Sequence, residues 1–388
     1  MKEDLSLKNK FIESMKYSST INFYRERRII ENVNGFSKSI SKHLMKFENV
    51  IIINSLKEYV HFINSLLLNR YKKKNSSESI REKYIFRGIS KQSQLKSTIN
   101  RYYDEFGDFN NEFEFIRKFE ENGSLKIGQF NNPIDLAAAA QHYGVYTRLI
   151  DWTYSPLIAT LFALFENNIN FNHDYYCVLY RNYRQSLVLN SLNEDEKVSN
   201  CSMNRRYASM IKKLDEIIEL RETMSYKLRN KLSNFDNQKY EFLEEYCNDF
   251  KEEIPKIRQI LEYFEKIVKK TKYDKSKEEI ENITYQLFRK FMKLDTQIFI
   301  ETNFSNERLR SQRGLFEIDC LIKNIDRFKG TSIILISSAA RFEIIKYIDR
   351  LGFGYYQLMD DPSNAATTIN KTIKGEYSYD RKINYDYD

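Results

Sequence analysis

One stretch of this chain, residues 134–166, constrains the fold more than any other. The chain at large is rich in Lys, Asn, Glu, Ile and Tyr, whereas this stretch holds a run of four alanines, the only tryptophan and one of the four prolines. Small alanine side chains let a helix lie close to another element. We therefore predict that this stretch forms the packed functional centre of the molecule.

The stretch divides into three predicted elements. The first is a helix over 134–141, which Gly144 can end in the left-handed conformation. The second is a strand or extended link over 145–152, indicated by its Val, Tyr, Thr, Leu and Ile residues. The third is another helix, with Thr153 or Ser155 as its cap.

Candidate functional residues lie at the junctions between these elements, where binding sites are common. They are His142, Arg148, Asp151 and Trp152. Each also has a purely structural interpretation. Arg148 and Asp151 can form a buried ion pair, Trp152 can be a core residue, and His142 can cap the preceding helix.

Length and composition indicate a folded protein. The 388 residues can bury a sizeable core, as one large domain with an insertion or as two to three smaller domains. Hydrophobic residues make up 41% and aromatic residues 14%, which argues against disorder of the whole chain. The formal net charge of +8 comes from basic residues interspersed with acidic ones, so it does not by itself indicate nucleic acid.

The spacing of the cysteines and the length of the apolar runs indicate where in the cell the protein is expected. The four cysteines form no Cys-x-x-Cys pair and have no histidine at ligand spacing, which argues against disulfides and a metal site. The N-terminus lacks the apolar core of a signal peptide, and no apolar run approaches about 18 residues. We expect a soluble cytoplasmic protein with no metal and no membrane partner.

Changes in composition along the chain predict four segments. Residues 1–80 form an N-terminal helical extension, with an amphipathic helix over 56–71. Residues 81–190 and 295–388 form the main domain. Residues 191–294 are rich in Lys and Glu with apolar residues at three- and four-residue steps, which predicts an inserted hairpin of two or three helices. This insertion can serve as a lid, a partner-binding arm or an oligomer contact.

Short strands are predicted over 84–88, 175–180 and 331–336, and a helix over 339–350. The first strand ends in Arg87-Gly88, where a phosphate can bind the guanidinium of Arg87 and approach the main chain of Gly88, which has no side chain.

A surface ion pair is the structural alternative for Arg87. Over 310–320, strand alternation places Gln312, Gly314 and Phe316 on one face and Glu317 on the other.

Four pieces of the chain, in this order, resemble the FRG domain, a bacterial domain named after its Phe-Arg-Gly tripeptide. They are Phe86-Arg87-Gly88, residues 140–144 with 147–153, Arg308 with Gln312, Gly314 and Phe316, and the strand and helix over 332–351. The resemblance covers roughly residues 80–190 and 295–372. It leaves out residues 1–75, and the charged insertion is a departure from the family.

The order of these pieces is also similar to ADP-ribosyltransferase folds. That likeness implies an α+β fold, with a small mixed or antiparallel split sheet flanked by helices. It implies that Arg87 binds the pyrophosphate or ribose of NAD and that Thr153 and Ser155 match the second motif. Gln312 or Glu317 would match the third motif. The chain departs from the family here, because no glutamate follows two residues after Gln312.

The same likeness suggests roles for the other candidates. Asp151 or Glu317 would stabilise an oxocarbenium-like state. Trp152 or Tyr143 would stack on nicotinamide, and His142 would act as acid, base or hydroxyl ligand. The expected NAD-binding set is Arg87, Gly88, His142, Tyr143, Arg148, Trp152 and Thr153, and the expected catalytic set is Arg87, Asp151, Gln312 and Glu317.

The leading hypothesis is an NAD-directed enzyme that transfers ADP-ribose to a protein or nucleic acid, or hydrolyses NAD, as a bacterial toxin or anti-phage effector. The alternative is a non-catalytic module that binds a nucleotide or nucleic acid, with the insertion as its partner-binding arm. A third hypothesis is a scaffold or oligomer subunit.

Overall fold

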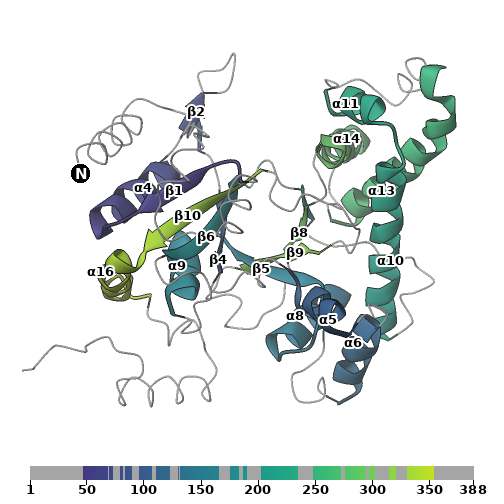
Figure 1. The fold of residues 1–388 in the computed structure, drawn as a ribbon. Helices are drawn as coiled ribbons and strands as arrows, with labels where there is room; N and C mark the ends of the chain where they lie inside the picture. Colours follow the sequence, from purple (N-terminus) through teal and green to yellow (C-terminus); the bar gives the residue numbers. More distant parts are fainter. Residues whose placement is uncertain are drawn as a thin grey trace, which may run out of the picture.

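A computed structural model describes residues 47–68, 70–72, 79–81, 84–89, 96–106, 111–122, 130, 132–165, 175–182, 187–189, 202–234, 248–271, 276–293, 297–301, 314–319 and 330–353 (Figure 1). Among these residues, eight strands form one sheet in the order β1-β10-β6-β4-β5-β9-β8-β7. The strands are β1 (Val50–Ile53), β4 (Tyr84–Ile89), β5 (Leu149–Thr153), β6 (Tyr175–Asn182), β7 (Leu187–Leu189), β8 (Ile298–Ile300), β9 (Gly314–Ile318) and β10 (Thr331–Ser337).

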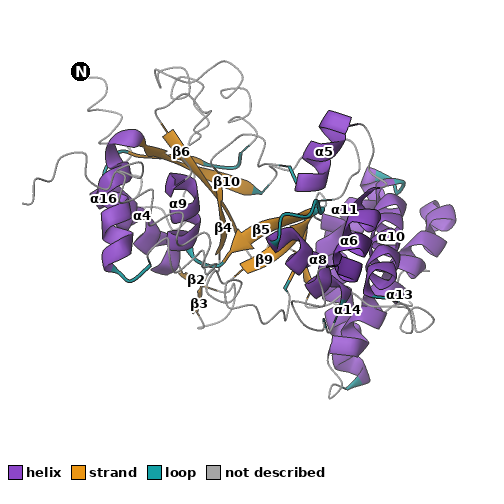
Figure 2. Cartoon of the chain, turned by 90° about the horizontal axis from the view of Figure 1, so that it is seen from below, coloured by secondary structure: helices purple, strands orange, loops and turns teal. Residues whose placement is uncertain are grey.

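The sheet is mixed and curled (Figure 2). Strand β1 is parallel to β10 and β7 is parallel to β8, while the other neighbouring strands are antiparallel. A separate antiparallel pair consists of β2 (Arg70–Lys72) and β3 (Ser79–Arg81). The predicted α+β class with a mixed sheet and flanking helices is confirmed, but the sheet is one curled sheet of eight described strands rather than the small split sheet that was expected.

Three helices cover one half of the sheet on its outer face (Figure 1). They are α4 (Leu56–Leu68), α9 (Pro156–Phe165) and α16 (Ser338–Arg350). Their apolar residues form one core with Phe86 of β4 and with alternate residues of β1, β6 and β10. The burial of this core removes a large apolar area from water and therefore stabilises this half of the sheet.

The remaining described helices gather on the other half (Figures 1 and 2). They are α5 (Thr98–Phe106), α6 (Asn111–Asn122), α8 (Pro133–His142), α10 (Met203–Glu222), α11 (Tyr226–Asn234), the short 3₁₀ helix η4 (Asn248–Glu253), α13 (Ile254–Thr271) and α14 (Lys277–Lys293). Except for α5, they share a second core with β5, β7, β8 and β9.

Helix α8 (Pro133–His142) extends one residue beyond the predicted 134–141 at each end. The Asn132 side chain accepts a hydrogen bond of 2.9 Å from the Asp135 amide, and Pro133 is the first helical residue. Gly144 follows the helix with φ of +87°. The alanines of residues 137–140 are all buried, and α10 packs against this helix.

The sheet face that points away from these two helical layers, here called the inner face, carries a third core. Because side chains alternate along a strand, Phe86 faces α9 whereas its neighbours Ile85 and Arg87 face inward. The apolar members of the third core include Ile85, Ile150, Trp152, Leu179, Phe299, Leu315 and Ile333.

Two predicted segments differ from the structure. Residues 50–68 do not form part of a separate N-terminal extension, because β1 pairs with β10 and α4 packs into the core of the sheet. The predicted helix over 56–71 is observed over Leu56–Leu68. The insertion is helical as predicted, but it has more helices than a hairpin and shares its core with α6 and α8. Among the described helices, none is long and apolar enough to cross a membrane.

Candidate functional site

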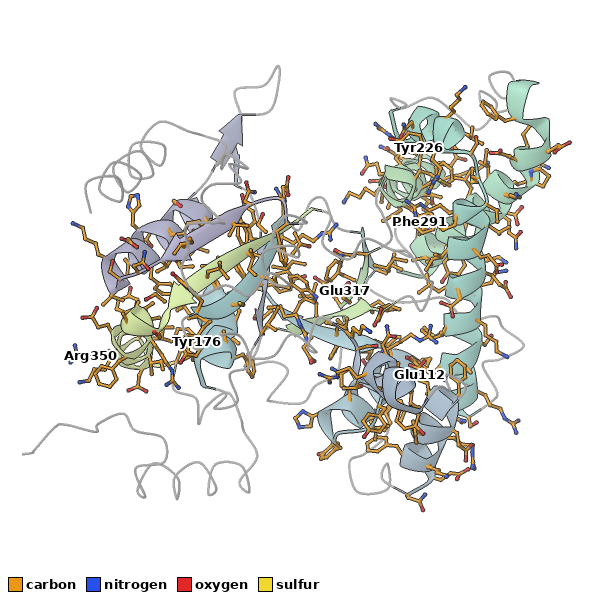
Figure 3. The ribbon with its side chains drawn as sticks, in the orientation of Figure 1. Glu112, Tyr176, Tyr226, Phe291, Glu317 and Arg350 are labelled. Atoms are coloured by element: carbon orange, nitrogen blue, oxygen red, sulfur yellow. The ribbon has the colours of Figure 1, made fainter. Side chains whose placement is uncertain are left out.

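Polar and charged residues gather on the inner face where β6, β4, β5 and β9 lie side by side. Strand β4 contributes Arg87, β6 contributes Arg181 and β9 contributes Glu317. The register explains the grouping, because Ile85 lies opposite Arg181 and Ile150 opposite Glu317, and directly opposite residues share a face. Glu317 lies between the two helical halves of the molecule (Figure 3).

The carboxyl of Glu317 is buried, with 7% of the residue exposed. The indole Nε1 of Trp152 donates a hydrogen bond of 2.7 Å to its Oε2. Burial raises the pKa of Glu317, the indole lowers it and Asp319 raises it. Arg181 and Arg87 lower it, and the net result is a raised pKa. A buried carboxyl with a raised pKa beside cationic groups is a frequent feature of catalytic sites.

Two arginines flank this carboxyl with different exposure. Arg181 is buried, and Gly330 leaves room for it: a Cβ there would be 3.3 Å from Nη2 of Arg181. Gly330 also has φ of +70°, a conformation that favours glycine. Arg87 is partly exposed, and its Nη1 donates to the main-chain carbonyl of Asp151. A partly exposed guanidinium and a buried one on the same sheet face suit an anionic ligand such as a pyrophosphate.

A second carboxylate lies further along the same face. The hydroxyl of Tyr154 donates to Oε1 of Glu301, which directly follows β8. Tyr154 packs against the core of the inner face, as does Trp152 two residues earlier. The inner face therefore presents two glutamates, two arginines, a tryptophan and a tyrosine.

Asp319 continues the inner face beyond the end of β9. It is buried, and its Oδ2 accepts hydrogen bonds from the Ser97 amide at 3.1 Å and from Nδ2 of Asn100 at 2.8 Å. Its own amide donates to the carbonyl of Arg148 at 2.8 Å. These bonds fix the start of α5 beside the end of β9, close to Glu317.

Residues 82–171 match the family model of the FRG domain. The chain contains an FRG domain. No curated protein and no solved structure matches the chain. The matched stretch includes Arg87, Trp152 and Tyr154, whereas Arg181, Glu317 and Glu301, which follows β8, lie outside it. The inner-face site is thus built jointly by the FRG domain and by later parts of the chain.

The structure places the Asp151 carboxylate on the opposite face of the sheet from the side chains of Arg87 and Glu317. Asp151 is exposed and lies between Ile150 and Trp152, which both face inward. Adjacent strand residues point to opposite faces, so the Asp151 carboxylate is on the outer face, away from Glu317. Only its main-chain carbonyl contacts Arg87. The predicted role of Asp151 in stabilising an oxocarbenium ion does not fit this placement.

Gly88 and Thr153 have structural roles in the FRG domain. A Cβ on Gly88 would be 2.1 Å from the carbonyl oxygen of Ala159, so the glycine lets α9 pack on β4. This contact occupies the space that the sequence interpretation reserved for a phosphate. The Oγ1 of Thr153 accepts from the Ser155 amide at 3.0 Å, and Oγ of Ser155 accepts from the Ile158 amide at 3.4 Å. Ser155 therefore caps α9, which is one of the two caps that the sequence predicts.

Arg148 is occupied by ion pairs rather than by a cofactor. Its Nε lies 2.7 Å from Oε2 of Glu112, and its Nη1 lies 3.0 Å from Oδ2 of Asp215 on α10. Burial lowers the pKa of Arg148, but the two carboxylates raise it more. Arg148 does form a buried ion pair, but its partners are Glu112 and Asp215, so the predicted pair with the exposed Asp151 is wrong.

His142 and Tyr143 belong to an aromatic cluster on the surface of the FRG domain. The Tyr143 ring is 57% exposed and stacks on Phe119 of α6 at 6.0 Å, and the His142 ring meets it edge-on at 5.0 Å. These rings therefore contact α6 rather than forming part of the inner-face cluster. Trp152 is 4% exposed and packs edge-on against Phe299, so it positions Glu317 and is no stacking platform.

The two remaining predicted residues, Gln312 and Arg308, lie outside the described residues. Within the described ranges, no group of three or more His, Cys, Asp or Glu residues is placed to hold a metal ion.

Sequence reasoning missed Arg181, Tyr154 and Glu301. The signal for Tyr154 was present, because strand alternation carries on from Trp152. The other two depend on strand pairings that one sequence does not reveal.

Proposed function

We propose that this FRG-domain protein is an NAD-directed enzyme that breaks the bond between ribose and nicotinamide and passes ADP-ribose to a macromolecule or to water. The observation that carries the proposal is the buried Glu317 carboxyl, hydrogen-bonded to Trp152 and acted on by the charges of Arg87 and Arg181. The two arginines complement the anionic pyrophosphate of NAD, and the carboxylate complements the positive charge of the transition state.

Each inner-face residue receives a role in this proposal. Arg87 and Arg181 bind the pyrophosphate of NAD. Glu317, held by Trp152, stabilises the positive charge that develops on the ribose as the bond breaks, and that charge favours its ionised form. Tyr154 and Glu301 lie on the same face and would orient the acceptor.

The proposed reaction balances without any further reagent. The bond between ribose C1′ and the nicotinamide nitrogen breaks, and its electron pair leaves with neutral nicotinamide. A hydroxyl, an amine or water then attacks C1′ and gives its proton to Glu301.

The order of the elements around Arg87 supports this proposal. Strand β4 carries the arginine after Phe86, and β5 ends at Thr153, which is followed by Ser155 and the alanine-bearing helix α9. This is the order that the sequence resemblance implies. The departure at Gly314 remains, and in the proposal Glu317 replaces the glutamate of the third motif.

The test is an assay of NAD consumption with purified protein, with and without cell lysate, using labelled NAD to trap acceptors. We expect Arg87→Ala and Glu317→Gln each to lower the rate by about 100-fold or more. Arg350→Ala and Glu343→Gln are matched controls, because both residues are exposed on α16, and they should leave the rate unchanged.

Two outcomes would overturn the proposal: a wild type that neither binds nor consumes NAD, or variants that consume it at the wild-type rate. Label in protein or nucleic acid would identify a transferase, and free ADP-ribose alone would identify a hydrolase. For the proposed toxin or anti-phage role, expression of the wild type should slow growth and Arg87→Ala should relieve it.

A further inference from the structure

Asp319 lies two residues after Glu317 and on the same face of the sheet. The strand pairing continues to this position, because the Asp319 amide donates to the Arg148 carbonyl at 2.8 Å. Phe316 and Ile318 pack in the core that the sheet shares with α10 and α13, on the face opposite to the inner face. Because side chains alternate along an extended chain, Glu317 and Asp319 both point inward. Two carboxyl groups are therefore neighbours in a buried environment, with 7% of Glu317 and 3% of Asp319 exposed.

One oxygen of Asp319 also holds the start of helix α5. Its Oδ2 accepts hydrogen bonds from the Ser97 amide at 3.1 Å and from Nδ2 of Asn100 at 2.8 Å. The carboxylate thereby satisfies a main-chain N–H at the first turn of the helix, where a negative charge is favourable. Because both bonds end on the same oxygen, Asp319→Asn can keep both of them while losing the charge.

Charged side chains reach the inner face from β4, β6 and the ends of β8 and β9. They are Arg87, Arg181, Glu301, Glu317 and Asp319. Three of them act on the Glu317 carboxyl: Asp319 disfavours its negative charge, whereas Arg181 and Arg87 favour it. The indole Nε1 of Trp152 favours the charge as well, through its hydrogen bond of 2.7 Å. The two side chains that α5 brings to Asp319 are uncharged, so Asp319 is the charge that opposes the two arginines.

We propose that Asp319 is a positioning residue of the inner-face site: it docks the start of α5 beside Glu317, and its negative charge opposes ionisation of the Glu317 carboxyl. Without that charge, the two arginines would keep Glu317 ionised to lower pH. In the proposed reaction the ionised form stabilises the ribose cation, so Asp319 raises the pH at which the enzyme becomes active. This last step rests on the proposed function, whereas the effect of Asp319 on Glu317 does not.

The fluorescence of Trp152 provides the test. It is the only tryptophan of the chain and it donates to Glu317, so its emission reports the charge of this carboxyl. The experiment titrates the emission of the full chain from about pH 4 to about pH 9. We expect Asp319→Asn to move the midpoint to lower pH by at least about 0.5 pH unit. Asp319→Ser is a second neutral variant and should move the midpoint in the same direction.

Three further variants separate the charge of Asp319 from its structural role. Glu317→Gln should remove the transition, which identifies the titrating group. Asp349→Asn makes the same chemical change on the exposed surface of α16 and should leave the midpoint in place. Asn100→Ala removes a hydrogen bond to Asp319 but keeps its charge, so it should lower the melting temperature without moving the midpoint to lower pH.

Three results would overturn the inference: a midpoint that stays in place in both neutral variants of Asp319, an equal shift in Asn100→Ala, or a transition that persists in Glu317→Gln. The rate of NAD consumption separates this inference from the proposed function. If NAD is consumed, the acidic limb of the pH–rate profile should move together with the midpoint in Asp319→Asn. If the midpoint moves and NAD is not consumed, the proposed function fails and the effect of Asp319 on Glu317 stands. If NAD is consumed and neither the midpoint nor the limb moves, the role of Asp319 alone fails.

Discussion

At the scale of single residues, ionisation of the Glu317 carboxyl makes the stability of the folded protein depend on pH. Burial raises its pKa above the value in the unfolded chain, so its contribution to stability is full at low pH and is lost as pH rises through the folded-state pKa. Glu317→Gln keeps an oxygen that can accept from Trp152 Nε1 but cannot ionise. We expect the melting temperature of this variant to exceed that of the wild type by an amount that grows from about pH 4 to about pH 8.

Calorimetry of both proteins over that pH range checks this expectation. The exposed Glu343→Gln variant is the control and should follow the wild type at every pH. A difference that shrinks as pH rises would show that the arginines, rather than burial, dominate the environment of Glu317. Higher stability together with lost NAD consumption would separate a catalytic role from a structural one.

The sequence could nominate Arg87, Trp152 and Glu317 because each sits in a recognisable motif or alternating strand. The sequence could not show which side chains of different strands lie on the same face of the sheet. Asp151 was grouped with them by proximity in sequence, yet strand alternation places its carboxylate on the opposite side. Arg181 reaches the site only through the pairing of β4 with β6, and that register is absent from any local pattern.

At the scale of elements, the packing of α9 on β4 depends on Gly88. A Cβ at this position would lie 2.1 Å from the Ala159 carbonyl oxygen and 2.6 Å from the Ala163 nitrogen, and both are backbone atoms that cannot move without shifting α9. Gly88→Ala should therefore lower the free energy of unfolding by about 3 kcal/mol or more. Denaturation in urea measures this change.

Gly144→Ala and Gly352→Ala are the comparison for Gly88→Ala. Both glycines have positive φ, and a Cβ added at either would meet nothing within 4 Å, so only backbone strain of about 1–2 kcal/mol is expected. If Gly88→Ala costs no more than these two, the close contact between α9 and β4 is incorrect.

Sequence patterns predicted those elements whose signals are local. The helix-forming composition and terminal Gly144 of α8 and the cap residue of α9 placed both helices, and β4, β6 and β10 were recognised as apolar runs. Strands β1, β7 and β8 were not predicted, because runs of three or four residues carry too few alternating positions. Their place in the sheet is decided by partners far away in sequence.

At the scale of the whole molecule, the helical insertion is joined to the FRG domain by buried charges. Glu112 of α6 is fully buried and accepts hydrogen bonds from the Arg148 amide at 3.0 Å, from Arg148 Nε at 2.7 Å and from the Tyr207 hydroxyl at 2.9 Å. Asp215 of α10 completes the network through Arg148 Nη1. Sequence periodicity predicted the helices, but their docking depends on this pairing, which no local pattern encodes.

A further bond ties the same two parts together. The Glu120 carboxylate on α6 accepts from the Met203 amide at 2.7 Å and from the Asn204 amide at 3.1 Å, and so caps the first turn of α10. The insertion therefore packs as part of the domain rather than as a separate arm. Arg148, which binds Asp215 of α10, directly precedes β5, the strand of Trp152.

This coupling gives a prediction for the stability of the whole chain. Removing one member of a buried ion pair leaves the other charge uncompensated and typically costs about 3–5 kcal/mol. We expect Glu112→Gln and Arg148→Met each to lower the free energy of unfolding by that amount in urea denaturation. The double variant should lose less than the two single losses combined, because only the partly exposed Asp215 is then left without its partner. Glu219→Gln, exposed on α10, should be neutral. Additive losses in the double variant would mean that the two residues act independently.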